Sequence, residues 1–327
     1  MGKLRWGLAF ALLFAVSVSL VQAITVSSGA CSGGGCAGGS ETWSVNHGVV
    51  SGTSKTTISF ASGAPLYNVG LNIDAEGREV DSSLKFAQNY WASGRAGVDV
   101  DANADVRNFG KVLGSQTGWT LGCPNVNVKL NYEGTDNFDE NIVQRNTIIG
   151  ARTASVTNTA LISSTAGTKD ITQSTTFNAY GADSKNLFSE NIIEGTHGTP
   201  ATGDIFNIAQ SNMVNAKGLN IKTDLINEAN AESLYDTKIT QTNLDCNTQL
   251  GKTGTDSQTG QNNALLKSDA GNILGSQTNY QKATEWYSNH YSQVGNNLLD
   301  ANAFINVDVK QKNTQVAISR RKAITDS

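Results

Sequence analysis

The chain has 327 residues, a formal net charge of −4 and only 16% charged residues. A chain of this length can bury a large core, and the lack of a basic surplus disfavours nucleic-acid binding. Asn, Gln, Ser and Thr supply 34, 15, 30 and 32 residues, against 3 Pro. This composition excludes a proline-rich or charge-rich disordered stalk and predicts a folded protein whose polar groups are mainly amides and hydroxyls.

Residues 1–23 have the pattern of a signal peptide. Lys3 and Arg5 precede an apolar run over residues 6–20, and Val21-Gln22-Ala23 fits the rule for a cleavage site. The run is shorter than the ~20 residues of a membrane span, and an uncleaved anchor is the alternative. We therefore expect an exported protein, secreted to the cell surface or beyond it, with no membrane span after cleavage.

Four cysteines follow, at Cys31, Cys36, Cys123 and Cys246, and they allow two disulfides in any of three pairings. Cys31 and Cys36 flank a Ser-Gly-Gly-Gly loop in a Gly/Ser-rich arm over residues 24–41. The other two would then close a long loop, worth about 4–5 kcal/mol on the chain-entropy model. The alternative is that the arm bonds to a neighbouring molecule, whereas the spacing disfavours zinc.

Short runs with alternating polarity begin near residue 42. They occur at residues 56–60, 67–73, 98–106, 125–132 and 304–309. Alternation with a period of two is typical of a strand with one buried face. We predict a mainly β fold, either a stacked-strand β-solenoid or a β-sandwich-like sheet assembly, with short helices as a possible addition.

No linker divides residues 42–327, which are therefore expected to form a single β-rich structural domain. Residues 205–231 and 283–304 can also be written on a helical face, so helix competes with strand there. Leu113-Gly-Ser-Gln-Thr recurs at Leu274-Gly-Ser-Gln-Thr, but no fixed period emerges. A solenoid of identical coils is therefore not predicted.

The asparagines depart from their usual role in turns. Nineteen of the 34 are followed directly by Val, Ile, Leu, Met, Phe or Tyr, and none by Gly. They are therefore expected inside strands, on the face opposite the apolar residues, where stacked amides form ladders. No Asn starts a glycosylation sequon, which suggests that the strand faces pack against other molecules.

Chemical signatures are few. His47, His197 and His290 stand alone, and neither a Gly-x-Ser-x-Gly elbow nor a phosphate-binding glycine loop occurs. We therefore expect a protein without catalytic residues and without a cofactor, calcium being the one ion considered. A secreted polysaccharide-active enzyme is the third alternative for function.

One acidic run is a candidate calcium site. Its members are Asp99, Asp101, Asn103 and Asp105. They have the spacing of a calcium loop but lack its Gly and Glu. On a strand they would share one face, which would bind Ca²⁺ between molecules or pair with a basic strand such as Lys310/Lys312.

An aromatic cluster is a candidate carbohydrate site. Trp286, Tyr287 and Tyr291 lie close together in the sequence, and exposed aromatic rings can stack on sugars. Such residues also anchor subunit interfaces. They support the second alternative for function, a β-sandwich or β-helix adhesin on the cell surface.

In its amide-rich, proline-poor strands the mature chain resembles functional-amyloid and sheath proteins, such as the tube-forming sheath subunits of filamentous methanogens. Residues 125–132, 153–180 and 304–319 carry this likeness. The resemblance implies self-association through sheet edges, resistance to denaturants and disulfide cross-links between subunits. The leading expectation is therefore a secreted structural subunit that forms a sheath, fibre or surface layer, with itself and other envelope components as partners.

Overall fold

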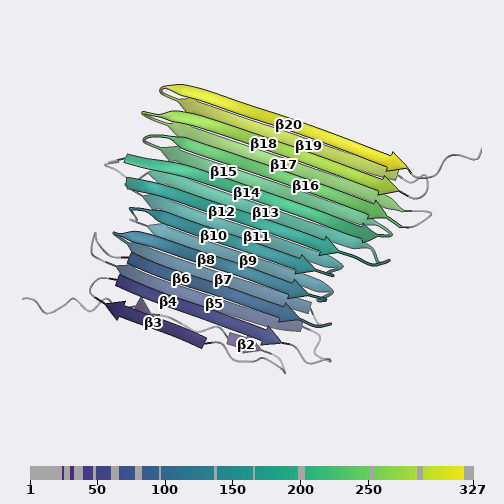
Figure 1. Ribbon diagram of the computed structural model, residues 1–327, viewed down its shortest axis with the longest axis horizontal. Coiled ribbons are helices and arrows are strands. Elements are labelled where there is room, and N and C mark those ends of the chain that lie inside the picture. The colour runs from purple at the N-terminus through teal and green to yellow at the C-terminus, as the bar shows by residue number, and fades with distance from the viewer. Residues whose placement is uncertain are drawn as a thin grey trace, which may run out of the picture.

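The computed structural model describes the chain in twelve segments (Figure 1). These are residues 24–25, 30–32, 40–46, 49–59, 66–77, 83–95, 97–135, 138–164, 166–197, 203–250, 254–285 and 290–319. The predicted signal peptide lies outside the described residues. Among the residues that are described, strands account for nearly all and helices for none, which confirms the mainly β prediction.

The strands form two sheets. Sheet A contains β1 (Ile24–Thr25), β2 (Ala30–Ser32), β5 (Leu66–Gly77), β7 (Gly97–Asn108), β9 (Asn125–Thr135), β11 (Thr153–Ser164), β13 (Lys185–His197), β15 (Ile221–Ser233), β17 (Thr255–Ser268) and β19 (His290–Ala303). Sheet B contains β3 (Ser40–Asn46), β4 (Val49–Ser59), β6 (Ser83–Ser93), β8 (Lys111–Leu121), β10 (Glu140–Ile149), β12 (Ala166–Ala179), β14 (Gly203–Gly218), β16 (Thr237–Gln249), β18 (Asn272–Glu285) and β20 (Asn306–Ser319).

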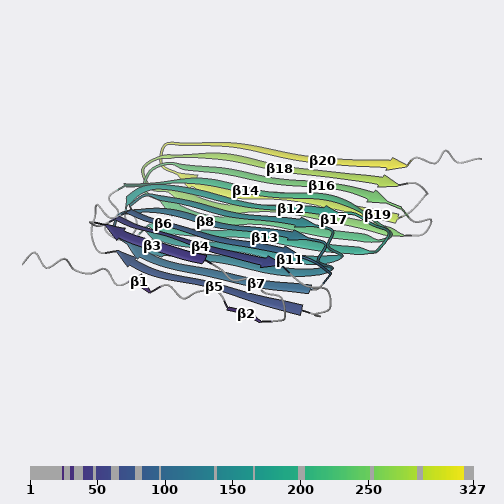
Figure 2. The same cartoon turned by 60° about the horizontal axis from the view of Figure 1, so that its bottom comes forward.

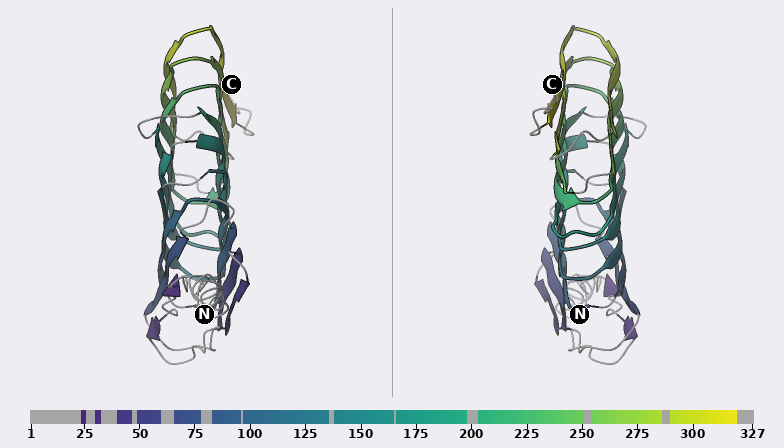
Figure 3. Two further views of the ribbon diagram at one scale, coloured as in Figure 1. Left: turned by 90° about the vertical axis from the view of Figure 1, so that its left-hand side faces the viewer. Right: turned by 90° about the vertical axis from the view of Figure 1, so that its right-hand side faces the viewer.

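From β4 onward the chain alternates between the sheets, one strand in each, and every strand pairs in parallel with the strand two places along. The fold is therefore a flattened β-solenoid with two strands per coil. Figures 1 and 2 show the coils stacked in sequence order, and Figure 3 shows the two sheets facing each other edge-on.

Alternate side chains of each strand point into the space between the sheets, as the two-residue period of a strand requires. Two apolar clusters fill much of this space. One extends from Leu71 to Leu225, and the other extends from Ile73 to Ile273, with Leu299 packed against it. Between these clusters runs a band of buried amides, described below, so the core is apolar on both sides of a polar seam.

Glycines make room for aromatic rings in adjacent coils. A Cβ on Gly118 would lie 1.9 Å from the ring of Tyr90, and one on Gly114 would lie 2.4 Å from the ring of Phe86. Because parallel in-register strands stack side chains directly over one another, a large ring in one coil demands a small residue in the next. These two glycines therefore fix packing rather than turns.

The turns between the sheets also stack. Gly122 and Gly150 have φ of 75° and 82°, a left-handed conformation that glycine adopts without strain. Their amides donate to Ile149 O and Asn178 O at 2.8 Å, each in the next coil. The hydrogen bonds between adjacent coils therefore continue through the turns that connect the two sheets.

The structure decides between helix and strand for the two ambiguous stretches. Residues 205–231 lie in β14 and β15, and residues 290–303 of the second stretch form β19. The prediction of helix is wrong for the described residues of both stretches, because strand pairing, on both edges of β14 and β15 and on one edge of β19, holds alternate residues inward. The two copies of Leu-Gly-Ser-Gln-Thr occupy the same register position, on β8 and β18.

The two ends of the solenoid differ. At the N-terminal end, β3 pairs antiparallel with β4, and the short β1 and β2 pair antiparallel with β5. At the C-terminal end, β19 and β20 are the last strands of their sheets and have 14 residues each. Among the described residues, no strand pairs with their outer edges.

Candidate functional site

A column of glutamines runs through the core of sheet B from β6 to its last strand, β20. Its members, one on every even strand from β6 to β20, are Gln88, Gln116, Gln144, Gln173, Gln210, Gln241, Gln277 and Gln311. Each Nε2 donates to Oε1 of the preceding glutamine at 2.7–3.0 Å. These distances are those of well-formed hydrogen bonds, so the column is an uninterrupted amide ladder.

The glutamines also join the two sheets. Nε2 of Gln144 donates to Leu130 O at 2.9 Å and to Thr159 O at 2.8 Å, both in sheet A. Gln173 and Gln210 repeat this arrangement in the following coils. A buried amide is costly only when it lacks partners, and this geometry gives each amide nitrogen partners in both sheets.

Two columns of asparagines run beside the glutamines. The column of sheet A contains Asn158, Asn191, Asn227, Asn262 and Asn297, joined by bonds of 2.7–2.8 Å. The column of sheet B contains Asn212, Asn243, Asn279 and Asn313, joined by bonds of 3.0–3.1 Å. Bonds of 2.8–3.1 Å also cross the core between the columns, so each strand is held both to its neighbours and to the facing sheet.

Amide ladders are thus confirmed, but their position corrects the sequence-based expectation. The asparagines of these columns point inward, on the same face as buried apolar residues such as Val156 and Ala160. Asn127 and Asn131 do lie on the outer face, where they donate to Asp99 and Asn103. The sequence periodicity could not distinguish inward from outward asparagines. A buried amide is stable only when a facing sheet supplies hydrogen-bond partners, and the sequence pattern does not show that sheet.

The last coil leaves this polar seam open. Gln311, Asn313 and Gln315 continue inward columns whose earlier members are buried, yet they are exposed on β20. Oε1 of Gln311 has no donor among the described residues, and Nδ2 of Asn313 has no acceptor there. The C-terminal end therefore presents two strand edges together with unfilled donors and acceptors of the ladder.

Three buried carboxyl groups lie in the same half of the core. Asp245, Asp256 and Glu285 come from β16, β17 and β18 and are 1–4% exposed. Burial raises the pKa of Asp245 to about 8, with a further rise from Asp256 and opposing hydrogen bonds from Thr223 and Gln258. Burial raises the pKa of Asp256 to about 7, although the bond from Asn247 Nδ2 at 3.0 Å lowers it. At least Asp245 is therefore largely protonated at neutral pH.

The predicted acidic run does form one face of a strand. Asp99, Asp101, Asn103 and Asp105 all point outward from β7. Asn127 donates to Asp99 at 2.9 Å, and Arg107 forms an ion pair with Asp105 at 3.3 Å. β7 pairs with β5 and β9, so the suggested pairing with Lys310 and Lys312 does not form within one chain.

The cysteines are not brought together where the structure describes them. Cys123 is a buried free thiol between β8 and β9, and Cys246 is a half-buried free thiol on β16. Four strand spacings separate them, about 19 Å, far beyond disulfide reach; the predicted long-range loop is therefore not formed. Cys31 lies on β2, whereas Cys36 lies outside the described residues.

The aromatic cluster is placed only in part. Tyr291 lies on β19 and is 52% exposed, whereas Trp286 and Tyr287 lie outside the described residues. One exposed ring at the edge of the last coil does not make a stacking platform. A carbohydrate site at these residues therefore stays a prediction.

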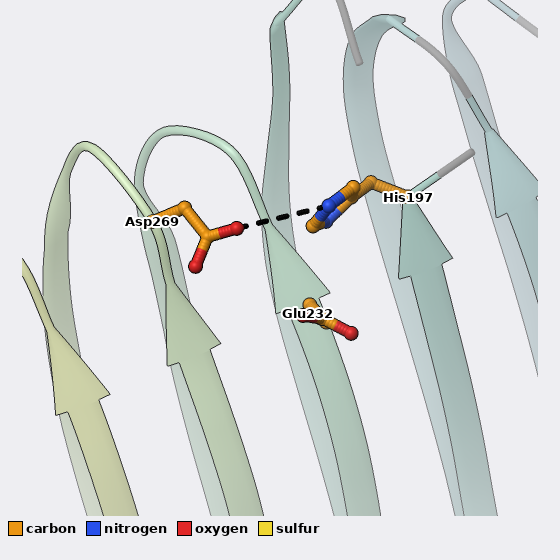
Figure 4. A group of neighbouring side chains, drawn as sticks. All are labelled: His197, Glu232 and Asp269. Atoms are coloured by element: carbon orange, nitrogen blue, oxygen red, sulfur yellow. Dashed lines mark ion pairs between the residues drawn. The ribbon is translucent and has the colours of Figure 1, made fainter. Parts of the chain in front are cut away.

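Figure 4 shows a group that sequence spacing missed, His197, Glu232 and Asp269. Nε2 of His197 lies 3.8 Å from Asp269, and Nζ of Lys267 contacts both Glu232 and Asp269. The ammonium group already occupies the position that a metal cation would take between the two carboxylates. These residues come from β13, β15 and the turn after β17, and they lie close together only because the register of these strands aligns them.

No family model, curated protein or solved structure matches the chain. Among the described residues, none forms a helix long and apolar enough to cross a membrane. Function is therefore inferred from the residues and their geometry.

Proposed function

We propose that the protein is a secreted structural subunit that assembles with further copies through its strand edges into an extracellular sheath, fibre or surface layer. The observation that carries this proposal is the open C-terminal end. Exposed parallel edges with unpaired backbone groups are a template for another strand. Here the edges also carry Gln311 and Asn313, members of columns whose amides bond from coil to coil in the preceding strands.

The chemistry of the ladder favours another amide-bearing chain as the partner. A strand that pairs with β20 and carries inward amides would fill Oε1 of Gln311 and Nδ2 of Asn313, and it would exclude water from them. Chains of such bonds strengthen one another in a medium of low dielectric. The low charge and the absent glycosylation sequons agree with a chain whose surfaces are packed.

The test is concentration-dependent assembly of purified protein, followed by sedimentation, electron microscopy and fibre diffraction. Assemblies should give a meridional spacing near 4.7–4.8 Å. Replacing the inward amides, Asn313→Lys with Gln315→Lys, should block assembly, because two charges would face the incoming strand. The matched control, Thr314→Lys with Val316→Lys, adds the same charges to the outward face of β20 and should still assemble.

Wild-type protein that stays monomeric at high concentration would contradict the proposal. The adhesin alternative would then be tested by sugar binding with Tyr291→Ala and Trp286→Ala. Non-reducing electrophoresis of the assemblies separately tests cross-links through Cys31 and Cys36, since only bonds between molecules give covalent oligomers that reductant converts to monomers.

A further inference from the structure

The two outer faces of the solenoid carry opposite charge. From β6 to β20, ten acidic and four basic side chains point outward from sheet A, and two acidic and eight basic side chains point outward from sheet B. The formal charges of these faces are therefore −6 and +6. We call the outer face of sheet A the acidic face and the outer face of sheet B the basic face.

The residues are distributed over nearly every strand. The acidic face has Asp99, Asp101, Asp105, Glu133, Glu190, Glu194, Asp224, Glu228, Glu232 and Asp300, with Arg107, Lys129, Lys222 and Lys267. The basic face has Lys85, Lys111, Arg145, Lys217, Lys238, Lys282, Lys310 and Lys312, with Asp170 and Asp308. The separation is thus a property of the whole sheet and not of one cluster.

Repulsion on the acidic face is relieved only in part within the chain. Asp224 and Glu228 flank Ile226, the residue paired with Glu190 on the neighbouring strand, so both carboxylates are diagonal neighbours of Glu190. Burial raises the pKa of Glu190, and these two carboxylates raise it further. Of the four bases on this face, Arg107 and Lys267 already form ion pairs with acids of the same face.

The faces are flat enough and large enough for a stable contact. Figure 3 shows both sheets nearly planar when seen edge-on. Strands about 40 Å long, stacked about 4.8 Å apart over seven or eight coils, give each face about 1,400 Å². A standard interface needs about 800 Å² per partner. Each face also exposes large apolar side chains, Leu161, Leu265 and Leu298 on the acidic face and Leu113, Met213 and Leu274 on the basic face.

From this complementarity we propose that the acidic face of one copy packs on the basic face of a second copy, so that molecules stack in layers along the sheet normal. The contact is heterologous: each added copy leaves one acidic and one basic face free, and stacking does not close. This deepens the proposed structural function by naming a second direction of assembly. It uses residues other than those at the C-terminal end.

The test uses two charge-reversed proteins. The first carries Glu133→Lys, Glu190→Lys, Glu194→Lys and Glu228→Lys, which change the acidic face from −6 to +2, so that both faces are positive. The second carries Lys85→Glu, Arg145→Glu, Lys238→Glu and Lys282→Glu, which change the basic face from +6 to −2, so that both faces are negative. Each is carried on the Asn313→Lys/Gln315→Lys background, whose edges are blocked, so that sedimentation velocity reports face-to-face association alone. A further protein with all eight reversals keeps complementary faces with their signs exchanged.

The background protein should associate at about 0.01 M salt and dissociate at about 1 M, where the Debye length falls from about 30 Å to about 3 Å. Each single-face variant should lose self-association by about tenfold or more. Mixing the two variants should restore it, because positive faces then meet negative ones. The protein with all eight reversals should also associate, which would show that none of the changes acts by unfolding the chain.

Other outcomes overturn the proposal. Association that is unchanged in both single-face variants, or absent from the background protein at low salt, excludes a face-to-face contact. Loss with the basic-face variant alone points to an anionic partner other than a second copy. Failure of edge-driven assembly contradicts the structural-subunit proposal but leaves this measurement intact, and fibres that ignore the charge reversals contradict only the layering.

Discussion

Strands β7–β11 and strands β15–β18 share one backbone architecture but fill the same inward positions differently. One column of sheet B reads Ile148, Phe177 and Val214 in the middle coils and then Asp245 and Gln281 toward the C-terminal end. In sheet A, Val98, Val126 and Ala154 give way to Thr223 and Gln258. In these columns apolar side chains therefore give way to amides and carboxyl groups toward the C-terminal end, while the glutamine ladder and one apolar cluster run through both regions.

This difference has a consequence for self-association. The exposed end of an apolar core is stable only when another apolar surface covers it. The end of a hydrogen-bonded ladder, in contrast, favours a strand that supplies donors and acceptors at matching positions. Apolar packing tolerates many partners of suitable volume, but a buried amide left unpaired is costly. The C-terminal coils, which combine the glutamine ladder with two asparagine columns, therefore have more of the chemistry for selective addition than the coils nearer the N-terminus.

The largest expected effect is a pH dependence that arises mainly from the amide-rich coils. Asp245 and Asp256 have raised pKa values in the folded state, so folding favours their protonated forms. Stability is greatest below their unfolded pKa near 4, falls as pH rises toward about 8, and is constant above it. The change is on the order of 5 kcal/mol for Asp245 alone.

Urea unfolding at pH 4.5, 7 and 9 measures this effect. Asp245→Asn should flatten the profile between pH 7 and 9, whereas Asp170→Asn, on the outer face of β12, should not. Stability that rises over this range would show that the acids are paired in a way that the geometry does not provide.

Removing a large apolar side chain should be costly in the apolar region. Phe177 is fully buried in β12, and Phe177→Ala should lower the free energy of unfolding by about 3–5 kcal/mol through lost burial and a residual cavity. Tyr180→Ala removes an aromatic side chain that is about half exposed just beyond β12 and should cost much less. Equal losses in chemical denaturation would remove the distinction.

Breaking the band of buried amides should lower the free energy of unfolding by about 2–4 kcal/mol, because it leaves buried donors and acceptors without partners. Asn227 accepts bonds from Asn191 and Asn212 and donates to Asn243 and Asn262. Asn227→Leu keeps a similar volume but removes all four. Strand-resolved hydrogen exchange should accelerate in β13–β17, whereas Asn230→Leu on the outer face of the same strand should leave exchange there unchanged.

The smallest expected effect comes from extending the asparagine column of sheet B. Thr175 interrupts the asparagine column of sheet B between Asn146 and Asn212. Thr175→Asn is nearly isosteric and adds amide partners, so it should change stability by about 1 kcal/mol or less, toward a more stable protein. Thr176→Asn, which points outward, is the control, and a marked loss of stability at position 175 would mean that the column cannot be extended.

The sequence alone was sufficient for the β class and for the presence of amide ladders. Alternation at residues 98–106 and 125–132 correctly predicts strands with one buried face, because the period of two is a local property of the backbone. The recurrence of Leu-Gly-Ser-Gln-Thr is also meaningful, since both copies place a glutamine in the same ladder. Asp99 to Asp105 share a face for the same local reason.

The coil repeat was not visible because the coils differ in length. Successive ladder glutamines lie 28, 28, 29, 37, 31, 36 and 34 residues apart. Turns absorb these differences while strand register is kept, as loops on a surface tolerate insertions. A search for a constant period therefore finds none, although every coil aligns its glutamine with the last.

What the sequence determined by itself is local: which segments extend, and which residue types alternate along them. Only the tertiary structure decided that asparagines such as Asn191 and Asn227 point inward, because their partners come from the facing sheet and from strands more than thirty residues away. The division of charge between the outer faces is likewise invisible until odd and even strands are assigned to separate sheets. Both depend on contacts between segments distant in sequence, which no local periodicity records.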